Sequence, residues 1–173
     1  AKNNVFCTLY ICWGAQAGLY HHYGIQKQNL DDKIFGIFKN YKTTVAEPLL
    51  RGFDDIFPAP QSRHTEIKSE DIKKHPELTI LAESEQSGVL LVKSNDNRQI
   101  FMTGHLEYDT ETLGVEYRRD LDQGKKIKMP ENYYPNNDPW NTPISTWRSH
   151  AHLFYSNWLN YYVYQATPFN FAD

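Results

Sequence analysis

The segment Val5-Phe6-Cys7-Thr8-Leu9-Tyr10-Ile11-Cys12-Trp13-Gly14 decides the fold. Apolar, β-branched and aromatic residues run from Val5 to Cys12, which is typical of a buried strand. The residues from Ala15 to Tyr23 are rich in helix formers, and Gly24 follows them as the expected C-cap. The sequence therefore predicts a strand, a sharp turn and a helix, with Cys12 at the corner.

The overall composition is that of a folded globular domain. Of the 173 residues, 40% are hydrophobic and 23% are charged, and this length fits one domain. The net charge of −3 does not support a surface for nucleic acid or acidic membranes. Two cysteines are too few for a disulfide framework, and the sequence shows neither an apolar run of membrane-spanning length nor a signal peptide. We therefore expect a cytoplasmic protein.

The rest of the sequence predicts short strands, two more helices and a turn-rich segment between them. One helix is expected from Asp109, as N-cap, to Gly124, and the last helix from Thr146 to Gln165. Strands are expected at residues 34–38, 64–67, 79–83, 88–92 and 99–103, with Asn95-Asp96-Asn97 as a hairpin turn between the last two. We expect one α/β domain over residues 1–173.

The first strand has an unusual place in the sequence. A strand that ends at a nucleophile normally lies centrally in an open α/β sheet, but no strand precedes this one. Either the later strands supply all of its neighbours, or the chain is the C-terminal portion of a longer protein. We favour the second alternative, since the sequence also starts without Met.

Cys12 is the strongest candidate for a chemical role. At the start of a helix, unpaired N–H groups and the helix dipole lower the pKa of a thiol and favour the nucleophilic thiolate. Gly14, two residues later, permits a tight turn and close approach of a substrate, as in a nucleophile elbow. The alternative is that Cys12 is a small buried hydrophobic residue, which is the interpretation we favour for Cys7 inside the strand.

A second group of reactive residues lies in Thr103-Gly104-His105-Leu106-Glu107. His105 comes at the end of a predicted strand, where α/β enzymes place their active sites. If the backbone stays extended, Glu107 lies on the same side, and its carboxylate can fix the tautomer of the imidazole. An isolated His-x-Glu is more often a solvated loop, but together with the cysteine corner it predicts a Cys-His-Glu triad.

Other polar and aromatic residues are weaker candidates. Four further histidines lack companions at metal-ligand spacing, so we expect surface or packing roles for them and no metal site. These are His21, His22, His150 and His152. The run Ser62-Arg63-His64-Thr65-Glu66 could line a pocket and Arg118-Arg119 could bind a carboxylate, but such residues are more often solvated surface. The aromatic residues from Trp147 to Tyr164 fit a core or a subunit contact better than a cofactor site.

Several of these segments occur in a family-specific order. They are Ile11-Cys12-Trp13-Gly14-Ala15-Gln16-Ala17, Leu50-Arg51-Gly52-Phe53-Asp54, Ser62-Arg63-His64-Thr65-Glu66, Gly104-His105-Leu106-Glu107-Tyr108-Asp109 and Trp147-Arg148-Ser149-His150. The pattern resembles the C-terminal part of the homoserine O-acyltransferases of the glutamine-amidotransferase-like type, which activate homoserine for methionine biosynthesis. This resemblance covers essentially the whole chain. It implies a class I glutamine-amidotransferase-like (flavodoxin-like) open sheet with flanking helices, without its N-terminal strands.

The resemblance also implies an activity and roles for particular residues. An acetyl or succinyl group would move from acyl-CoA, as a co-substrate, to L-homoserine, with no other cofactor, and we expect a homodimer. The implied residues are Cys12 as acyl-accepting nucleophile, His105 as proton acceptor, Glu107 as third member of the triad, and Lys33, Ser62 and Arg119 as contacts of the acceptor amino acid. One departure is visible, because the family usually has Pro between the His and the Glu, where this chain has Leu106.

Three other interpretations stay open. The same fold could acylate serine, since one methylene in a pocket is worth only about 1–3 kcal/mol. A glutaminase of the related amidotransferase class would use the same triad, but those enzymes usually carry Gly two residues before the nucleophile, where this chain has Tyr10. An inactive fragment or binding module would leave Cys12 as an inert buried thiol.

Overall fold

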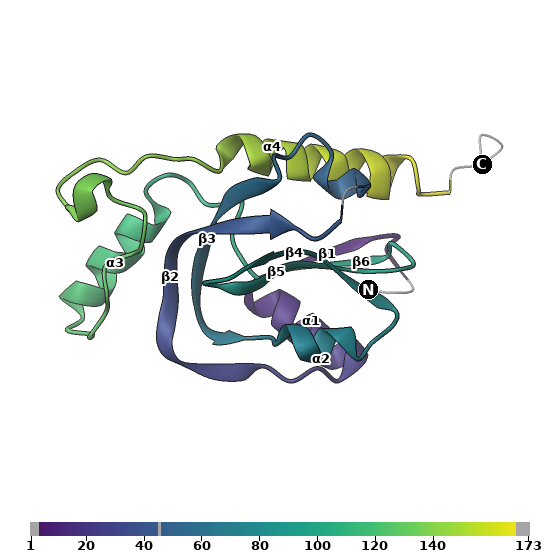
Figure 1. The fold of residues 1–173 in the computed structure, drawn as a ribbon, viewed down its shortest axis with the longest axis horizontal. Helices are drawn as coiled ribbons and strands as arrows, with labels where there is room; N and C mark the ends of the chain where they lie inside the picture. Colours follow the sequence, from purple (N-terminus) through teal and green to yellow (C-terminus); the bar gives the residue numbers. More distant parts are fainter. Residues whose placement is uncertain (1–3, 45, 169–173) are drawn as a thin grey trace.

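A curled sheet of six strands organises the computed structural model, which describes residues 4–44 and 46–168 (Figure 1). The strands are β1 (Thr8–Ile11), β2 (Gln28–Lys42), β3 (Ile56–Glu66), β4 (Leu78–Ser84), β5 (Gly88–Ser94) and β6 (Gln99–Met102). Their order across the sheet is β1-β6-β5-β4-β2-β3. β1 and β6 are parallel, and the other neighbouring pairs are antiparallel. The predicted α/β class, an open sheet with flanking helices, is confirmed.

β1 lies at one end of the sheet. Among the described residues it pairs with β6 alone, in the register Thr8 to Gln99 and Ile11 to Met102. The neighbour of β1 in this part of the chain is therefore a strand that follows it in the sequence.

Helices cover both faces of the sheet (Figure 1). α1 (Trp13–Tyr23) and α2 (Ser69–Lys73) lie on one side, and α4 (Arg148–Asn157) lies on the other. α4 continues into a π-helical segment, Trp158–Tyr164. α3 (Thr112–Asp122) lies beside the bend of β2. Within the described ranges, no helix is long and apolar enough to cross a membrane.

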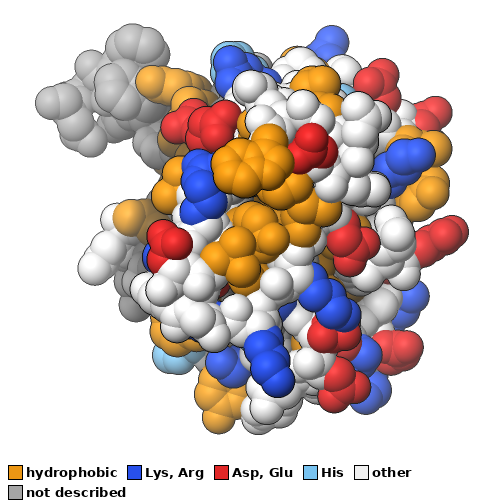
Figure 2. Space-filling model, turned by 90° about the vertical axis from the view of Figure 1, so that its left-hand side faces the viewer, with side chains coloured by type: hydrophobic (Ala, Val, Ile, Leu, Met, Phe, Trp, Pro, Cys, Tyr) orange, Lys and Arg blue, Asp and Glu red, His pale blue; other side chains and the backbone are white. Residues whose placement is uncertain are grey.

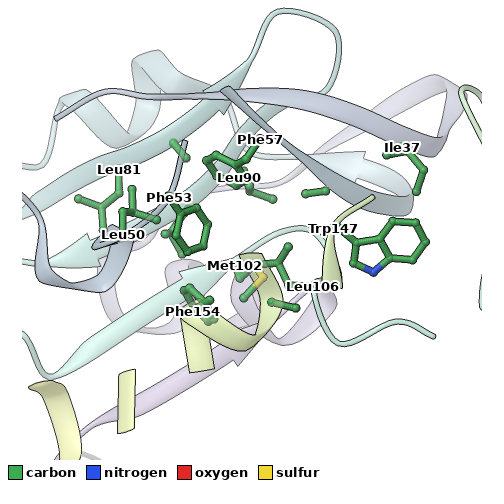
Figure 3. Packing of buried hydrophobic residues seen from close by; sticks show 14 of the residues in the cluster. Ile37, Leu50, Phe53, Phe57, Leu81, Leu90, Met102, Leu106, Trp147 and Phe154 are labelled. Carbon is green, nitrogen blue, oxygen red and sulfur yellow. The ribbon is translucent and has the colours of Figure 1, made fainter. Parts of the chain in front are cut away.

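Apolar clusters on the two faces of the sheet hold these helices in place. One cluster, which includes Phe57, Met102 and Phe154, packs α4 onto the sheet (Figure 3). The other contains Leu19 and Phe101 and packs α1 onto the opposite face. Because side chains alternate along a strand, β6 contributes adjacent residues to the two clusters. Each large apolar side chain buried in this way stabilises the fold by about 1.5–3 kcal/mol, so β6 is fixed from both faces.

The prediction for the third strand was too short. The sequence predicted this strand only at residues 64–67, which leaves out the preceding stretch with Pro58 and Pro60. β3 begins at Ile56 and pairs with β2 throughout that proline-containing stretch. It is the outermost strand on its side, so a proline that lacks an N–H donor is tolerated there.

The predicted helix starts also need correction. Asp109 is not an N-cap: α3 begins at Thr112 with Glu111 as its N-cap, because Asp109 belongs to a turn in which its carbonyl accepts a hydrogen bond from Thr112 N at 3.1 Å. The last helix begins at Arg148, not Thr146, and its π-helical continuation places Tyr162 in the core. The short helix α2, which buries Ile72, was not predicted.

Candidate active site

Cys12 lies at a strained corner between β1 and α1. Its backbone has φ 51° and ψ −114°, a left-handed region that non-glycine residues rarely adopt. Two hydrogen bonds hold this conformation, from Cys12 N to Met102 O at 2.7 Å and from Gln16 N to Cys12 O at 3.1 Å. The N–H groups of Trp13 and Gly14 come before the first intrahelical bond of α1, so they point outward at the helix start. This geometry is that of a nucleophile elbow.

His105 and Glu107 lie in the turn that follows β6. Nδ1 of His105 is 2.6 Å from Oε1 of Glu107. The sequence prediction assumed an extended backbone here, but the structure has a turn. Tyr108 N donates to His105 O at 3.3 Å, so the side chains of His105 and Glu107 meet across this turn. Leu106 is only 3% exposed and packs into the core, so it anchors the turn.

The surroundings of His105 fix its ring and its charge. The Tyr108 ring stacks on the imidazole with centroids 4.1 Å apart. Burial by itself lowers the pKa of His105, but hydrogen bonds to Cys12 and Glu107, together with their negative charges, outweigh it and raise the pKa to about 9. The structure thus brings Cys12, His105 and Glu107, hereafter the triad, into one hydrogen-bonded group.

The three expected substrate contacts converge on a residue that the sequence analysis missed, Glu116 on α3. Ser62 Oγ donates to both carboxylate oxygens of Glu116 at 2.9 Å. Lys33 Nζ lies 2.8 Å from Glu116 Oε1, and Arg119 Nη2 lies 3.6 Å from the same oxygen. We call Lys33, Ser62, Glu116 and Arg119 the Glu116 cluster. The signal for Glu116 was its place three residues before Arg119 on a predicted helix, which puts both on one face.

The Glu116 cluster adjoins the triad. The Cys12 thiol is 3.9 Å from the carbonyl oxygen of Ser62, the residue whose hydroxyl contacts Glu116. Behind the cluster, Asp120 accepts hydrogen bonds from Arg119 and from Lys125 at 2.9 Å, and these contacts lower the pKa of its carboxyl to about 2. A cavity of about 200 Å³, lined by Lys33, Asp120 and neighbouring side chains, opens beside them.

The molecular face that carries α3 bears charges of both signs. Figure 2 shows Lys and Arg interspersed with Asp and Glu around hydrophobic side chains. This mixture agrees with the nearly balanced charge of the sequence.

Two of the other histidines have structural partners. His150 is buried against Phe53 and Phe57, with Nε2 3.2 Å from Asp54 Oδ2. His22 contacts the Tyr10 hydroxyl at 3.0 Å. No group of three His, Cys, Asp or Glu residues suited to a metal ion occurs in the described part of the chain.

Cys7 has a different environment from Cys12. It packs at the edge of the core and accepts a hydrogen bond from the Trp158 indole at 3.4 Å. Burial raises the pKa of its thiol.

Comparisons with known proteins agree with this architecture. At the level of fold alone, the chain is similar to a glutamine amidotransferase from Thermotoga maritima, with a TM-score of 0.60, 17% identity, and coverage of 90% of this chain and 62% of that one. A glutamine amidotransferase from Methylobacillus flagellatus gives a TM-score of 0.56 at 14% identity, over 87% of this chain and 61% of that one. The glutamine-amidotransferase-like fold expected from the resemblance is confirmed.

Sequence relatives give the family. A protein from Geobacillus sp. strain WCH70 named homoserine O-acetyltransferase is 61% identical over 97% of this chain and 56% of its own length. A protein of the same name from Bacteroides fragilis is 57% identical over 100% of this chain and 57% of its own length. The chain therefore spans little more than half of these relatives. The sequence model of the family described as homoserine O-succinyltransferase matches residues 1–169, and the chain belongs to this family.

Proposed function

We propose that this chain carries the reaction centre of an enzyme that moves an acetyl or succinyl group from acyl-CoA to the hydroxyl of L-homoserine. The observation that carries the proposal is the triad: a cysteine at a strained elbow contacts an imidazole that Glu107 holds at 2.6 Å. The names of the relatives support homoserine as the acceptor. Since those relatives are longer, the proposed activity is that of the whole protein.

In the first half-reaction the Cys12 thiolate attacks the carbonyl carbon of the acyl thioester. The N–H groups of Trp13 and Gly14 at the start of α1 would stabilise the negative charge on the carbonyl oxygen. The bond to the sulfur of CoA then breaks, and the leaving thiolate takes the proton of the His105 imidazolium. The products are a thioester on Cys12, free CoA and a neutral His105.

In the second half-reaction neutral His105 takes the proton of the homoserine hydroxyl. The resulting oxygen nucleophile attacks the Cys12 thioester, the C–S bond breaks, and the thiolate and the imidazolium are restored. Acylation removes the negative charge of Cys12, which helps to raise the pKa of His105 in the free protein. The imidazole therefore becomes available as a base at the stage that needs one.

The Glu116 cluster suits an amino acid as acceptor. The Glu116 carboxylate can bind an ammonium group, while Lys33 and Arg119 offer positive charge to a carboxylate. Ser62 links this cluster to the triad, because its backbone carbonyl faces the Cys12 thiol. An amino acid held there would place its side-chain hydroxyl towards the thioester. Acylation would turn the side-chain hydroxyl of homoserine into a better leaving group. We propose that this activation of homoserine serves methionine biosynthesis.

The decisive experiment tests the covalent intermediate. The intact protein, incubated with acetyl-CoA or succinyl-CoA but no acceptor, should gain one acyl mass on the peptide that contains Cys12. Cys12→Ala should gain none, while Cys7→Ala serves as the matched control and should gain it normally. An adduct on Cys7, or acylation that survives Cys12→Ala, contradicts the proposal.

The rival activities separate in the same assay system. Comparison of kcat/KM for homoserine and serine identifies the acceptor, and ammonia release from glutamine would identify a glutaminase. In this structure the Tyr10 ring stacks on Phe101 at 5.0 Å between centroids, so the position where glutaminases usually carry Gly is filled. The cytoplasmic location, the homodimer and the absence of a further cofactor stay predictions.

A further inference from the structure

Arg63 on β3 is a buried cation with neutral hydrogen-bond partners. Its residue is only 5% exposed. The guanidinium donates to Gln61 Oε1 at 3.2 Å, to Thr65 O at 2.8 Å and to Ser87 O. These acceptors are amide and carbonyl oxygens. Arg63 forms no ion pair with a carboxylate in the described ranges, and the nearby Glu66 is paired with Lys68.

A buried guanidinium without a counter-ion is energetically unfavourable, and an arginine does not escape by losing its proton. Burial lowers the pKa of Arg63, whereas the negative charges of Glu66 and Cys12 raise it. The thiolate form of Cys12 is therefore one of two negative charges that act on this cation.

The partners of Arg63 also hold the elbow. Thr65 O, which accepts from Arg63, accepts from Gln16 Nε2 at 3.1 Å as well. The Thr65 hydroxyl in turn donates to Gln16 Oε1 at 2.6 Å. Gln16 is buried in the first turn of α1, and its N–H binds the carbonyl of Cys12. Arg63 is thus connected through two residues to the backbone of the nucleophile.

A second connection leads to the histidine. Gln61, which accepts from Arg63, lies against Gly104, where an added Cβ would be 3.0 Å from Gln61 Nε2. The next residue, His105, donates its backbone N–H to Pro60 O at 2.9 Å. The segment that contains Arg63 therefore supports both the Cys12 and the His105 sides of the triad.

We propose that Arg63 is a positioning residue for the acyl-transfer reaction, whose buried positive charge is balanced by the Cys12 thiolate and whose hydrogen bonds hold the elbow and the histidine turn together. This inference rests on the proposed role of Cys12 as the nucleophile. In this proposal two cations, the imidazolium of His105 and the guanidinium of Arg63, stabilise the thiolate of Cys12.

Other charged groups around Cys12 must be considered in any titration. The turn after β6 contributes His105, Glu107 and Tyr108. From α3, Glu116 and Arg119 lie close to Tyr108. Lys33 from β2 and Glu66 from β3 complete the set. The experiment therefore changes Arg63 alone and leaves all of these groups in place.

The test measures how the reactivity of Cys12 depends on pH. The intact protein is treated with iodoacetamide across a pH series, and the alkylation rates of the Cys12 and Cys7 peptides are followed by mass spectrometry. Arg63→Met keeps a long, unbranched side chain but removes the charge. It should raise the pH midpoint of Cys12 alkylation by about one unit, which makes alkylation about tenfold slower at pH values below the midpoint. Arg63→Lys keeps the charge and should shift the midpoint by less than about half a unit.

Controls separate a charge effect from a packing effect. Arg118→Met removes a cation from the exposed side of α3 and should leave the Cys12 midpoint unchanged, as should the Cys7 profile in every variant. A folded Arg63→Met protein with an unchanged midpoint overturns the proposal. If Arg63→Met does not fold, Arg63→Lys decides, because a shift of a full unit there also overturns it. Failure of wild-type Cys12 to accept an acyl group would instead contradict the proposed reaction, and the alkylation profile would still report on Arg63.

Discussion

The triad and the Glu116 cluster are adjacent, but different forces hold them. Backbone geometry places the triad: Cys12 is fixed by a strained corner, and His105 and Glu107 meet across one turn. The Glu116 cluster is held by contacts between long side chains, one of which, Arg119, is 54% exposed. We infer that the triad performs the same chemistry on any bound acyl group, while the cluster selects the acceptor. Variants of the triad should then impair both half-reactions, and variants of the cluster only the second.

The largest expected effect is at His105. His105→Ala should lower the rates of both half-reactions by about 10²–10⁴-fold, because the same imidazole protonates CoA and deprotonates homoserine. Glu107→Gln should cost less, since an amide oxygen can still accept the imidazole hydrogen bond. Single-turnover acylation and steady-state turnover measure the two steps. A wild-type rate for Glu107→Gln would show that its charge is not needed.

Gly104→Ala tests whether backbone geometry controls the triad. An added Cβ would lie 2.6 Å from Leu90 Cδ1 and 2.9 Å from the backbone oxygen of Pro60, so the turn must move. A displacement of His105 by about 1 Å should slow both half-reactions roughly 10²-fold. Gly124→Ala is the control, since nothing lies within 4 Å of a Cβ there and the strain at its φ of 69° falls just after α3, outside the triad and the Glu116 cluster. Equal losses in the two variants would contradict this explanation.

A smaller and more selective effect is expected at Arg119. Arg119→Lys should lower kcat/KM for homoserine about tenfold, because an ammonium cannot reproduce the paired hydrogen bonds of a guanidinium to a carboxylate. Acylation of Cys12 should keep its wild-type rate, since that step needs no acceptor. Arg118→Lys is the control: its side chain points about 100° away on the helix and lies 3.9 Å from Glu111. If Arg119→Lys blocks acylation as strongly as turnover, the division between the two groups is wrong.

The smallest effect is a dependence of stability on pH. The pKa of His105 is raised from its ordinary value of 6.5 to about 9 in the folded protein. When folding raises the pKa of a base, the protonated base stabilises the folded state. This stabilisation is complete at pH values below the pKa of the unfolded chain, and it is lost as the pH rises through the pKa of the folded protein. The Tm of the wild type should therefore fall between pH 6.5 and about 9 by more than that of His105→Gln. Parallel Tm curves for the two proteins would contradict the ion pair.

Local signals made one part of the site predictable. Cys12 and the pair His105 and Glu107 lie in short motifs at strand ends, so the sequence alone indicated that they come together, although the assumed extended backbone was a turn. Glu116 was missed because its partners lie on β2 and β3, and only the packing of α3 beside these strands brings them within reach. Arg63 was seen only as part of a polar run, since burial of a charge cannot be read from composition.

In the fold, too, features set by residues close in sequence were predictable, and features set by distant segments were not. The strand–turn–helix unit with Gly24 in a left-handed C-cap and the hairpin around Asn97 follow from residues close in sequence, and both predictions are confirmed. The start of β3 at Ile56 depended on its outer position in the sheet, which sequence patterns do not reveal. The start of α3 depended on a turn that Tyr133 stabilises from a distant segment, through its hydroxyl bond to Thr110 O at 2.6 Å.

The one-sided pairing of β1 has a consequence for hydrogen exchange. Thr8 and Cys12 direct their amides towards the β6 side, at 2.9 Å from Arg98 O and 2.7 Å from Met102 O. Because amide directions alternate along a strand, Leu9 and Ile11 direct theirs to the opposite side. Slow exchange of the Leu9 and Ile11 amides in the intact protein would therefore reveal a further strand that pairs with β1. Its pairing would reach Ile11, the residue before the nucleophile. Fast exchange there, with slow exchange at Cys12, would mark β1 as a true edge whose elbow is supported from β6 alone.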